Sequence, residues 1–332
     1  RLHDAGCWMM VIGLESFNQR LLDFMNKDTT VEINVEAVKT CQSLGVKVWA
    51  NVMYGLPTET KEEALEILYK EGVNACIVAG STNVLPDIKM KKLSPKILID
   101  LSTLKELRGI ENKQNKICIK PLTTIAELTH SELILKESKV LIQSAEQFAD
   151  PLVRNNATIG GNLVTASPAA DMAVPLLALD ALIKIESIEQ KREVKLKEFF
   201  LGPGKTVLQD DEMMVGIEFE QSDINKNGYF VKLGQRKAMA IAIASLALNL
   251  AMKQNKIIQI RIAMGSVAPR PIRLTVVEKF LENKEISSKL VEEAVSKIRE
   301  EVNPISDIRA SAEYRRYISG ILFKRALEKL TH

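Results

Sequence analysis

The sequence predicts an α+β fold: a small α/β region, then a mostly antiparallel β region, then an α+β region at the C-terminal end. Three observations lead to this prediction. An amphipathic helix and two short apolar strands follow one another between residues 61 and 101. Segments that read as strands, two of them as a hairpin, occur between residue 117 and residue 220. Two amphipathic helices then close the chain after residue 288.

Local patterns in the first two regions predict each element in turn. A helix is expected over Lys61–Lys70, followed by short apolar strands over Ala75–Ala79 and Ile97–Leu101. The elements expected next are a strand through Ile119, helices over Ile125–His130 and Val140–Ala149, a glycine turn, a hairpin of Ala181–Ile188 with Arg192–Leu196, and a strand over Glu212–Glu220.

The polar stretch Asn225–Gly228 is the predicted boundary before the last region. Three strands are expected beyond it, among them Met239–Met252 and one through Ile257 to Met264, and then helices over Ser288–Val302 and Ser311–Leu330. The repeat of Leu290, Ala294 and Ile298 marks a buried helix face. Arg315 and Arg316 are predicted to be cationic tips that face solvent or another subunit.

Composition indicates a cytoplasmic protein. The net charge of +3 over 332 residues, with no basic run of five, argues against a nucleic-acid-binding role. No apolar run reaches about eighteen residues, so no membrane span is expected. The four scattered cysteines do not resemble a disulfide framework, and no segment resembles a signal peptide.

Residues 158–171 carry the strongest functional signal. Gly160 and Gly161 lack a Cβ, so we expect a bend with positive φ that turns N–H groups toward an anion such as a pyrophosphate. Thr158, Asn162 and Thr165 add short polar side chains, and a lone carboxylate, Asp171, follows them. A glycine pair alone is typical of a hairpin, but the order of these residues favours a nucleotide site.

A second glycine turn, in Ala-Cys-Ile-Val-Ala-Gly-Ser-Thr-Asn-Val-Leu at residues 75–85, supports the same interpretation. Together the two segments resemble the FAD-binding subunit of the molybdenum hydroxylases, the family of xanthine dehydrogenase and carbon monoxide dehydrogenase medium subunits. The family has Ala-Gly-Gly-Thr-Asp at the first turn, so this chain departs at Ser81 and Asn83. The resemblance continues in residues 98–101, 203–206, 263–271 and 307–316 and spans residues 57–330.

The resemblance implies a two-subdomain FAD-binding fold over residues 57–224 and a C-terminal domain over residues 225–332. It implies an oxidoreductase subunit that holds FAD noncovalently and is not catalytically complete alone. Electrons would come from a large subunit with a molybdenum cofactor, through the two-iron clusters of an iron–sulfur small subunit. NAD or another acceptor would then take them from the flavin.

Carried over residue by residue, the resemblance assigns the cofactor site. Asp171 would accept from adenosine or ribityl hydroxyls, and Met214 would pack on the cofactor. Lys232 matches a family lysine near the flavin, although a surface lysine at a strand end is an equal alternative. The complete predicted set is Ala79, Gly80, Ser81, Thr82, Asn83, Val84, Thr158, Ile159, Gly160, Gly161, Asn162, Thr165, Asp171, Met214 and Lys232. No catalytic residue and no metal ligand is predicted.

Residues 1–56 resemble the later strands of a radical SAM barrel, through Gly13–Ser16, Leu22–Lys27 and Met53–Thr60. Between them we expect an amphipathic helix over Val31–Leu44, packing through Ile33, Ala37, Val38 and Cys41, and a strand over Val46–Met53. The cluster of that family needs Cys-x3-Cys-x2-Cys spacing, which is missing here. We therefore expect a truncated fragment without radical chemistry.

Two alternatives from other classes stay open: a radical SAM enzyme, and an assembly module that keeps the flavoprotein fold without FAD. Gly204–Thr206 resembles part of a phosphate loop but lacks its first glycine, because position 199 is Phe199. His130, at the end of a predicted helix, is expected to be a surface or capping residue.

Overall fold

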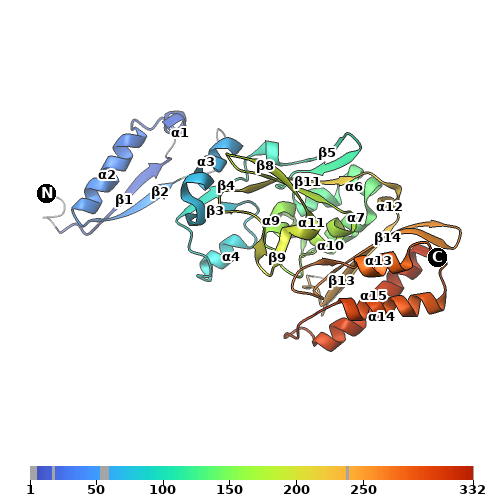
Figure 1. The fold of residues 1–332 in the computed structure, drawn as a ribbon. Helices are drawn as coiled ribbons and strands as arrows, with labels where there is room; N and C mark the ends of the chain where they lie inside the picture. The colour runs from blue at the N-terminus through green and yellow to red at the C-terminus, as the bar shows by residue number, and fades with distance from the viewer. Residues whose placement is uncertain (1–5, 17–18, 53–59, 237–238, 332) are drawn as a thin grey trace.

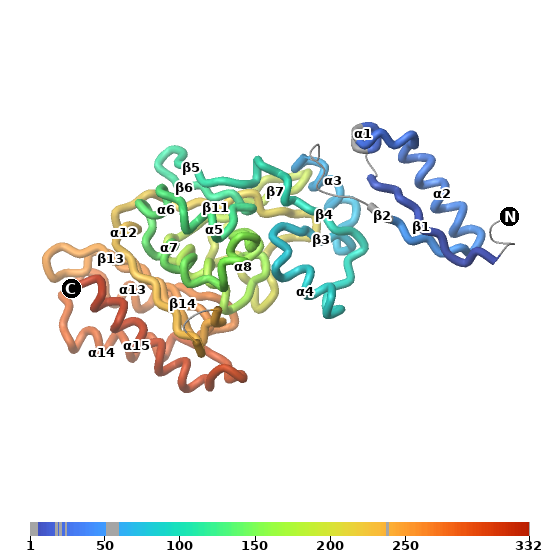
Figure 2. Tube along the Cα trace, turned by 180° about the vertical axis from the view of Figure 1, so that it is seen from behind, coloured from blue at the N-terminus to red at the C-terminus, as the bar shows by residue number. Residues whose placement is uncertain are grey.

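The computed structural model describes residues 6–16, 19–52, 60–236 and 239–331. Figure 1 shows helices and strands mixed along the chain, with antiparallel sheets in its larger part, so the predicted α+β class is confirmed. Residues 6–52 lie at one end of the molecule, beside the main body, in both Figure 1 and Figure 2. The predicted strand residue Met53 falls outside the described residues.

The N-terminal segment is a parallel strand pair with a helical crossover. Its elements are β1 (Met9–Glu15), α1 (Gln19–Phe24), α2 (Val31–Ser43) and β2 (Lys47–Val52). The predicted packing face of α2 is partly wrong, because Ile33 is 56% exposed and Ala37 is also exposed. Asn34 is buried instead, where its side-chain amide donates to the Leu14 carbonyl at 3.2 Å.

The predicted small α/β region is present. It contains α3 (Lys61–Glu71), η1 (Gly72–Asn74), β3 (Ala75–Val78), α4 (Val84–Lys89), β4 (Ile97–Asp100) and η2 (Lys105–Leu107). Strands β3 and β4 pair in parallel. Thr60 and Glu63 form a capping box that starts α3. This helix buries Ala64, Leu65 and Leu68 against the strands.

A five-stranded antiparallel sheet of order β5-β6-β11-β7-β8 forms the middle of the molecule. Its strands are β5 (Ile110–Lys113), β6 (Lys116–Ile119), β7 (Leu182–Glu186), β8 (Lys191–Lys195) and β11 (Met213–Glu220). A register shift between Met214 and Gly216 lets Met214 and Ile217 face the same side. That side packs on the main core, whereas Met213 and Val215 pack on the core of the α/β region.

Short helices fill the chain between β6 and β7. They are α5 (Ile125–Thr129), α6 (Glu132–Glu137), α7 (Lys139–Glu146), α8 (Pro151–Asn156), α9 (Ile159–Val164) and α10 (Ala173–Ala178). The connection to β11 holds α11 (Leu196–Phe199), β9 (Phe200–Gly202) and β10 (Lys205–Thr206), and α12 (Asp223–Lys226) follows β11. The predicted glycine turn at residues 158–162 is wrong, because it forms the first turn of α9.

The C-terminal region is a four-stranded antiparallel sheet with three helices. Its elements are β12 (Gly228–Leu233), β13 (Ala244–Lys253), β14 (Lys256–Gly265), β15 (Ile272–Arg273), α13 (Thr275–Leu281), α14 (Ser288–Glu301) and α15 (Ala312–Thr331). Sequence patterns missed β15 and α13. The strand predicted from Met239 begins only at Ala244, because Met239 has φ 55° in the preceding loop.

This sheet packs on both faces. Leu246, Leu248 and Leu250 of β13 contact a core shared with α14 and α15, and Ala247 on the opposite face joins the core shared with α7 and α10. The predicted buried face of α14, Leu290, Ala294 and Ile298, is confirmed. None of the helices among the described residues is both long and apolar enough to cross a bilayer.

Candidate functional site

The turn after β3 presents backbone donors. Gly80 is packed so closely that a Cβ would lie 1.9 Å from the Asn156 carbonyl oxygen. Ser81 has φ 61°, a left-handed conformation that favours glycine, which is the residue the family has at this position. The N–H groups of Gly80, Ser81, Thr82 and Asn83 donate no hydrogen bond within the described part of the chain. Ala79 and Val84 flank this turn.

The segment at residues 158–162 differs from the predicted bend. Neither Gly160 nor Gly161 has positive φ. Thr158 caps α9, and the N–H groups of Gly160, Gly161 and Asn162 donate to Pro121 O at 2.9 Å, Thr158 Oγ1 at 3.1 Å and Thr158 O at 3.0 Å. The predicted backbone donors of this segment are therefore already used, because the segment is the capped start of a helix.

The two glycines of α9 have different environments. A Cβ at Gly160 would lie 2.7 Å from Pro121 Cβ and 2.8 Å from Pro121 O, so this position needs glycine for packing. Gly161 is exposed, and a Cβ there would approach only Thr158 Oγ1, at 2.9 Å. Ile159 is fully buried in the main core. The surface at Gly161 is therefore left smooth by the missing side chain.

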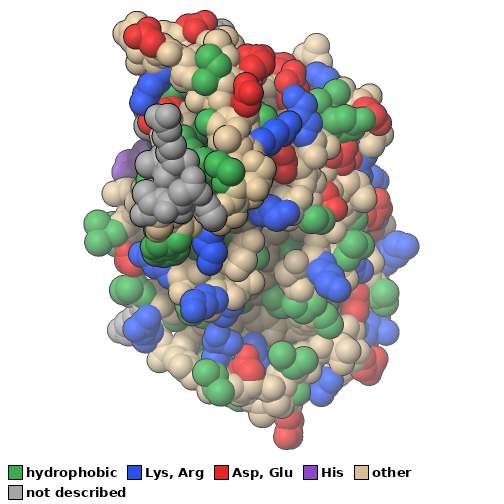
Figure 3. Space-filling model, turned by 90° about the vertical axis from the view of Figure 1, so that its left-hand side faces the viewer, with side chains coloured by type: hydrophobic (Ala, Val, Ile, Leu, Met, Phe, Trp, Pro, Cys, Tyr) green, Lys and Arg blue, Asp and Glu red, His purple; other side chains and the backbone are tan. Residues whose placement is uncertain are grey.

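The two segments meet in space although they are far apart in the sequence. Asn83 Nδ2 donates to Thr165 Oγ1 at 3.0 Å. Thr165 in turn donates to the Gly161 carbonyl at 2.8 Å. The turn that carries the Gly80–Asn83 amides therefore lies next to the surface of α9 at Gly161. Figure 3 shows a recess near the middle of one face of the molecule, with Lys and Arg side chains around it.

A buried ion pair joins the other two polar residues of the predicted set. Lys232 Nζ lies 2.6 Å from Asp171 Oδ2, and the two side chains are 6% and 11% exposed. Lys232 also donates to the Gln147 carbonyl at 3.2 Å. The surface alternative for Lys232 is therefore wrong. Burial raises the pKa of Asp171, although the charge of Lys232 and its hydrogen bond oppose that rise.

Asp171 keeps one oxygen for another partner. Its Oδ1 is buried and accepts no hydrogen bond within the described residues. Its backbone is fixed, because Ser144 Oγ donates to the Asp171 carbonyl at 2.8 Å and Asn162 Oδ1 accepts from the next amide, Met172, at 3.1 Å. An orphaned buried acceptor costs about 1–3 kcal/mol, so a hydroxyl, an amide or a water that donates to Oδ1 would stabilise this site.

Met214, the remaining residue of the predicted site, lies behind it in the core. It is 4% exposed and packs in the main core.

Neither His130 nor a metal-binding group extends the predicted site within the described part of the chain. His130 ends α5, and its Nδ1 lies 2.7 Å from the Ala126 carbonyl, as expected for a capping residue. No group of three or more His, Cys, Asp or Glu side chains that could hold a metal occurs among the residues that the structure places.

Sequence patterns misplaced Arg315. It is 3% exposed rather than a tip facing solvent, and it hydrogen-bonds to Ile243 O, Ser266 O and Asp307. Because α15 begins at Ala312, Arg315 lies in its first turn on the same buried side as Ile318, Ser319 and Leu322. An Asp-to-Arg pairing across eight residues of loop and helix has no periodic signal in a sequence.

Comparisons with known proteins identify the family of the chain. Residues 52–219 match the FAD binding domain in molybdopterin dehydrogenase, and residues 229–330 match the CO dehydrogenase flavoprotein C-terminal domain. Residues 1–69 match the radical SAM superfamily. The chain is 34% identical to the glyceraldehyde dehydrogenase medium chain of Sulfolobus acidocaldarius over 82% of this chain and 96% of that one. It is 31% identical to the carbon monoxide dehydrogenase medium chain of Hydrogenophaga pseudoflava over 80% and 92%.

Solved structures give the same result. Carbon monoxide dehydrogenase from Hydrogenophaga pseudoflava superposes with a TM-score of 0.79 at 30% identity, covering 82% of this chain and 94% of that one. Quinoline 2-oxidoreductase from Pseudomonas putida 86 gives 0.77 at 25% identity, with the same coverage. The predicted resemblance is therefore confirmed, and the chain belongs to the FAD-binding medium subunits of the molybdenum hydroxylase family of oxidoreductases.

Proposed function

We propose that this subunit binds FAD noncovalently where the turn Ala79–Val84 meets the segment Thr158–Asp171, and that it transfers electrons within a larger complex. The observation that carries the proposal is the contact between the two glycine segments, in which Asn83 Nδ2 donates to Thr165 Oγ1 at 3.0 Å. The first segment presents the amides of Gly80–Asn83, and the second contains the buried Oδ1 of Asp171, none of which is hydrogen-bonded within the described residues. FAD offers the matching groups, a pyrophosphate anion and sugar hydroxyls.

Each part of the site has a role in this proposal. The amides of Gly80–Asn83 hold the pyrophosphate, since consecutive N–H groups at a turn favour an anion. Gly161 lets the cofactor approach the surface of α9, and Thr165 fixes Asn83. Asp171 Oδ1 accepts from a hydroxyl group, and Lys232 holds that carboxyl group through Oδ2 at 2.6 Å. Met214 supports the site from the core side.

Bound FAD supplies chemistry that no side chain provides, the exchange of single electrons on one side and of a hydride on the other. We propose that an iron–sulfur small subunit delivers electrons from a molybdenum-cofactor large subunit, and that NAD or another acceptor removes them. Support comes from the relatives, which are named medium chains or medium subunits. The related carbon monoxide dehydrogenase from Hydrogenophaga pseudoflava was solved in a form that lacks the Mo-pyranopterin moiety of the molybdenum cofactor.

The isolated chain should bind about one FAD per monomer and should not oxidise an organic substrate. We expect at most electron transfer from NADH to an artificial dye, because the proposed large subunit holds the substrate site. Flavin absorbance after FAD titration and gel filtration measures binding, and anaerobic incubation with purines, aldehydes or carbon monoxide measures substrate-dependent flavin reduction. Failure to bind FAD would favour an assembly module, and flavin reduction by the single chain would contradict the proposed partnership.

We also propose that residues 57–224 and 225–332 are the functional domains and that residues 1–56 are dispensable for the flavin. Every residue proposed to contact the cofactor lies after residue 78. The N-terminal segment leaves apolar side chains in solvent, with Trp8 and Trp49 each 66% exposed and Val11 63% exposed.

A chain that starts at Pro57 should therefore bind FAD with the affinity of the longer chain and should be more soluble, because exposed apolar surface and open strand edges favour aggregation. Fluorescence titration with FAD and light scattering measure the two effects. A large loss of FAD affinity in a truncated chain that keeps its far-UV circular dichroism would contradict the proposed division.

A further inference from the structure

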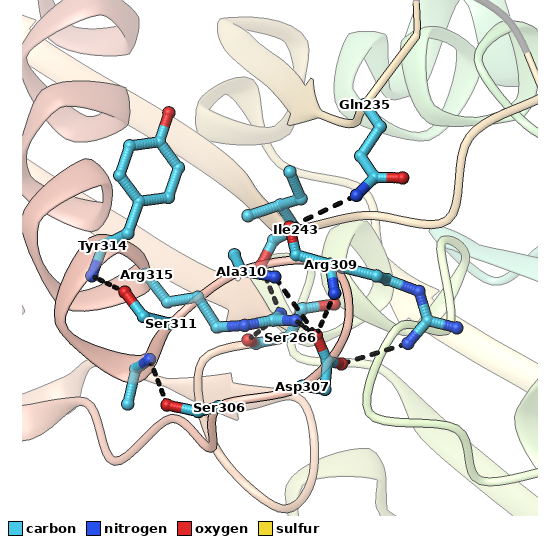
Figure 4. Close-up of polar contacts among 11 residues, drawn as sticks. Gln235, Ile243, Ser266, Ser306, Asp307, Arg309, Ala310, Ser311, Tyr314 and Arg315 are labelled. Atoms are coloured by element: carbon cyan, nitrogen blue, oxygen red, sulfur yellow. Dashed lines mark hydrogen bonds and ion pairs between the residues drawn. The ribbon is translucent and has the colours of Figure 1, made fainter.

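Arg315 is a buried cation at the start of α15 whose side chain is 4% exposed. Its NH1 group donates to Ile243 O at 2.6 Å and to Ser266 O at 3.0 Å, and its NH2 group donates to Asp307 Oδ1 at 2.7 Å. Figure 4 shows the guanidinium between these three groups, which come from three separate segments of the chain. A residue that only paired with Asp307 would not need the two carbonyls.

The Ile243 carbonyl connects Arg315 to the strand that carries Lys232. Ile243 joins the two ends of the loop between β12 and β13, because its N–H donates to the Leu233 carbonyl at 2.7 Å. Leu233 is the last residue of β12, and Lys232 precedes it on the same strand. The bond from Arg315 to Ile243 O therefore fixes the end of the strand that carries Lys232.

The Ser266 carbonyl connects Arg315 to the segment that carries Asp171. Ser266 follows the last residue of β14, and its N–H donates to the Pro168 carbonyl at 2.8 Å. Pro168 lies three residues before Asp171 in the same tight segment. This contact has little freedom, because a Cβ on the neighbouring Gly265 would lie 2.7 Å from Val174 Cγ2. The bond from Arg315 to Ser266 O therefore fixes the segment that carries Asp171.

The two chains of hydrogen bonds that start at Arg315 therefore end at the two partners of one ion pair. Lys232 Nζ and Asp171 Oδ2 of that pair lie 2.6 Å apart. We propose that Arg315 is a positioning residue for the flavin site: by holding Ile243 and Ser266 it sets the relative placement of Lys232 and Asp171. This inference rests on the proposed function, because it assigns these two residues to the site of FAD. It adds a structural link from the C-terminal helix α15 to the cofactor.

Arginine suits this position better than lysine. The planar guanidinium directs several N–H groups in fixed directions, so it can serve two carbonyls and one carboxylate together, whereas an ammonium has no such fork. Asp307 is also fixed. Burial would raise its pKa, but hydrogen bonds from the amides of Arg309 and Ala310 and from Arg315 outweigh that effect and lower the pKa to about 2. The carboxylate therefore stays charged at neutral pH and holds Arg315 in place.

The test compares R315K with two matched variants in the full chain. R316K changes the neighbouring residue of α15. R309M removes the other cation that pairs with Asp307, at 3.0 Å, without touching either carbonyl. We expect R315K to weaken FAD binding on the order of tenfold, which corresponds to about 1.4 kcal/mol. It should also change the visible circular dichroism of the bound flavin, while R316K and R309M bind FAD like the unmodified chain.

A second arm tests whether Arg315 acts through the ion pair. In a D171N/K232M background the R315K substitution should change FAD affinity no further, because the pair that it positions is already gone. Additive losses would overturn the inference. An R315K protein that binds FAD as tightly as the unmodified chain would also overturn the inference. The same holds if the FAD-free R315K protein is unfolded at 25 °C, because Arg315 would then be needed for folding. If the unmodified chain itself binds no FAD, the proposed function fails instead.

Discussion

Replacing Gly161 with valine is expected to abolish FAD binding while the chain stays folded. Gly161 is exposed in α9, has no positive φ, and would bring a Cβ near only Thr158 Oγ1, at 2.9 Å. The Thr158 hydroxyl that caps α9 would have to shift, so the free energy of unfolding should fall by no more than about 2 kcal/mol, the upper cost of losing an N-cap. A branched side chain would nevertheless fill the space that the cofactor needs, and we expect affinity to fall more than about a hundredfold, or about 2.7 kcal/mol.

Fluorescence titration with FAD and denaturant unfolding measure the two quantities. Val164→Ala, at a 41% exposed position of the same helix, is the matched control and should leave both unchanged. Gly160→Ala is a contrasting variant, because its Cβ would meet Pro121 at 2.7 Å and should destabilise the fold. A G161V protein that copurifies with a full complement of flavin would place the cofactor elsewhere.

Breaking the Lys232–Asp171 pair should have the largest effect on stability. In Lys232→Met the Asp171 carboxylate would keep no ionic partner among the described residues, in a site where it is 8% exposed. Removing one partner of a buried pair costs about 3–5 kcal/mol, since the other charge stays uncompensated. Asp171→Ala should cost a similar amount by leaving Lys232 with only the Gln147 carbonyl.

Two further measurements separate charge from packing. The D171N/K232M double variant should recover most of the lost stability, because no buried charge remains, but it should still bind FAD measurably more weakly than the unmodified chain. The K232M variant should also become more stable as the pH falls. Burial raises the folded pKa of Asp171 above its unfolded value, so the folded state binds the proton first and gains stability as the pH drops through that folded pKa. Single variants that lose less than about 1 kcal/mol would show that the pair is not buried in solution.

The sequence alone determined the features that depend on short-range patterns. The helix over residues 61–71, the β7–β8 hairpin and the buried face of α14 all follow from periodicity within one element. The two glycine segments also identified the family, because close approach of the backbone at Gly80 and Gly160 leaves glycine as the residue that fits. The prediction of positive φ at Gly160 and Gly161 was wrong. A sequence does not show whether a glycine is needed for its backbone conformation or for the space that a Cβ would fill.

Only the tertiary structure decided which polar groups meet. Lys232 lies 61 residues from Asp171, and Arg315 lies 72 residues from Ile243, so no local pattern links them. Their partners are set by the packing of the C-terminal sheet between α7 and α10 on one face and α15 on the other. Burial in that packing makes an unpaired charge costly, which is why Arg315, expected at the surface from its residue type, and Lys232, for which a surface position was an equal alternative, both form enclosed ion pairs.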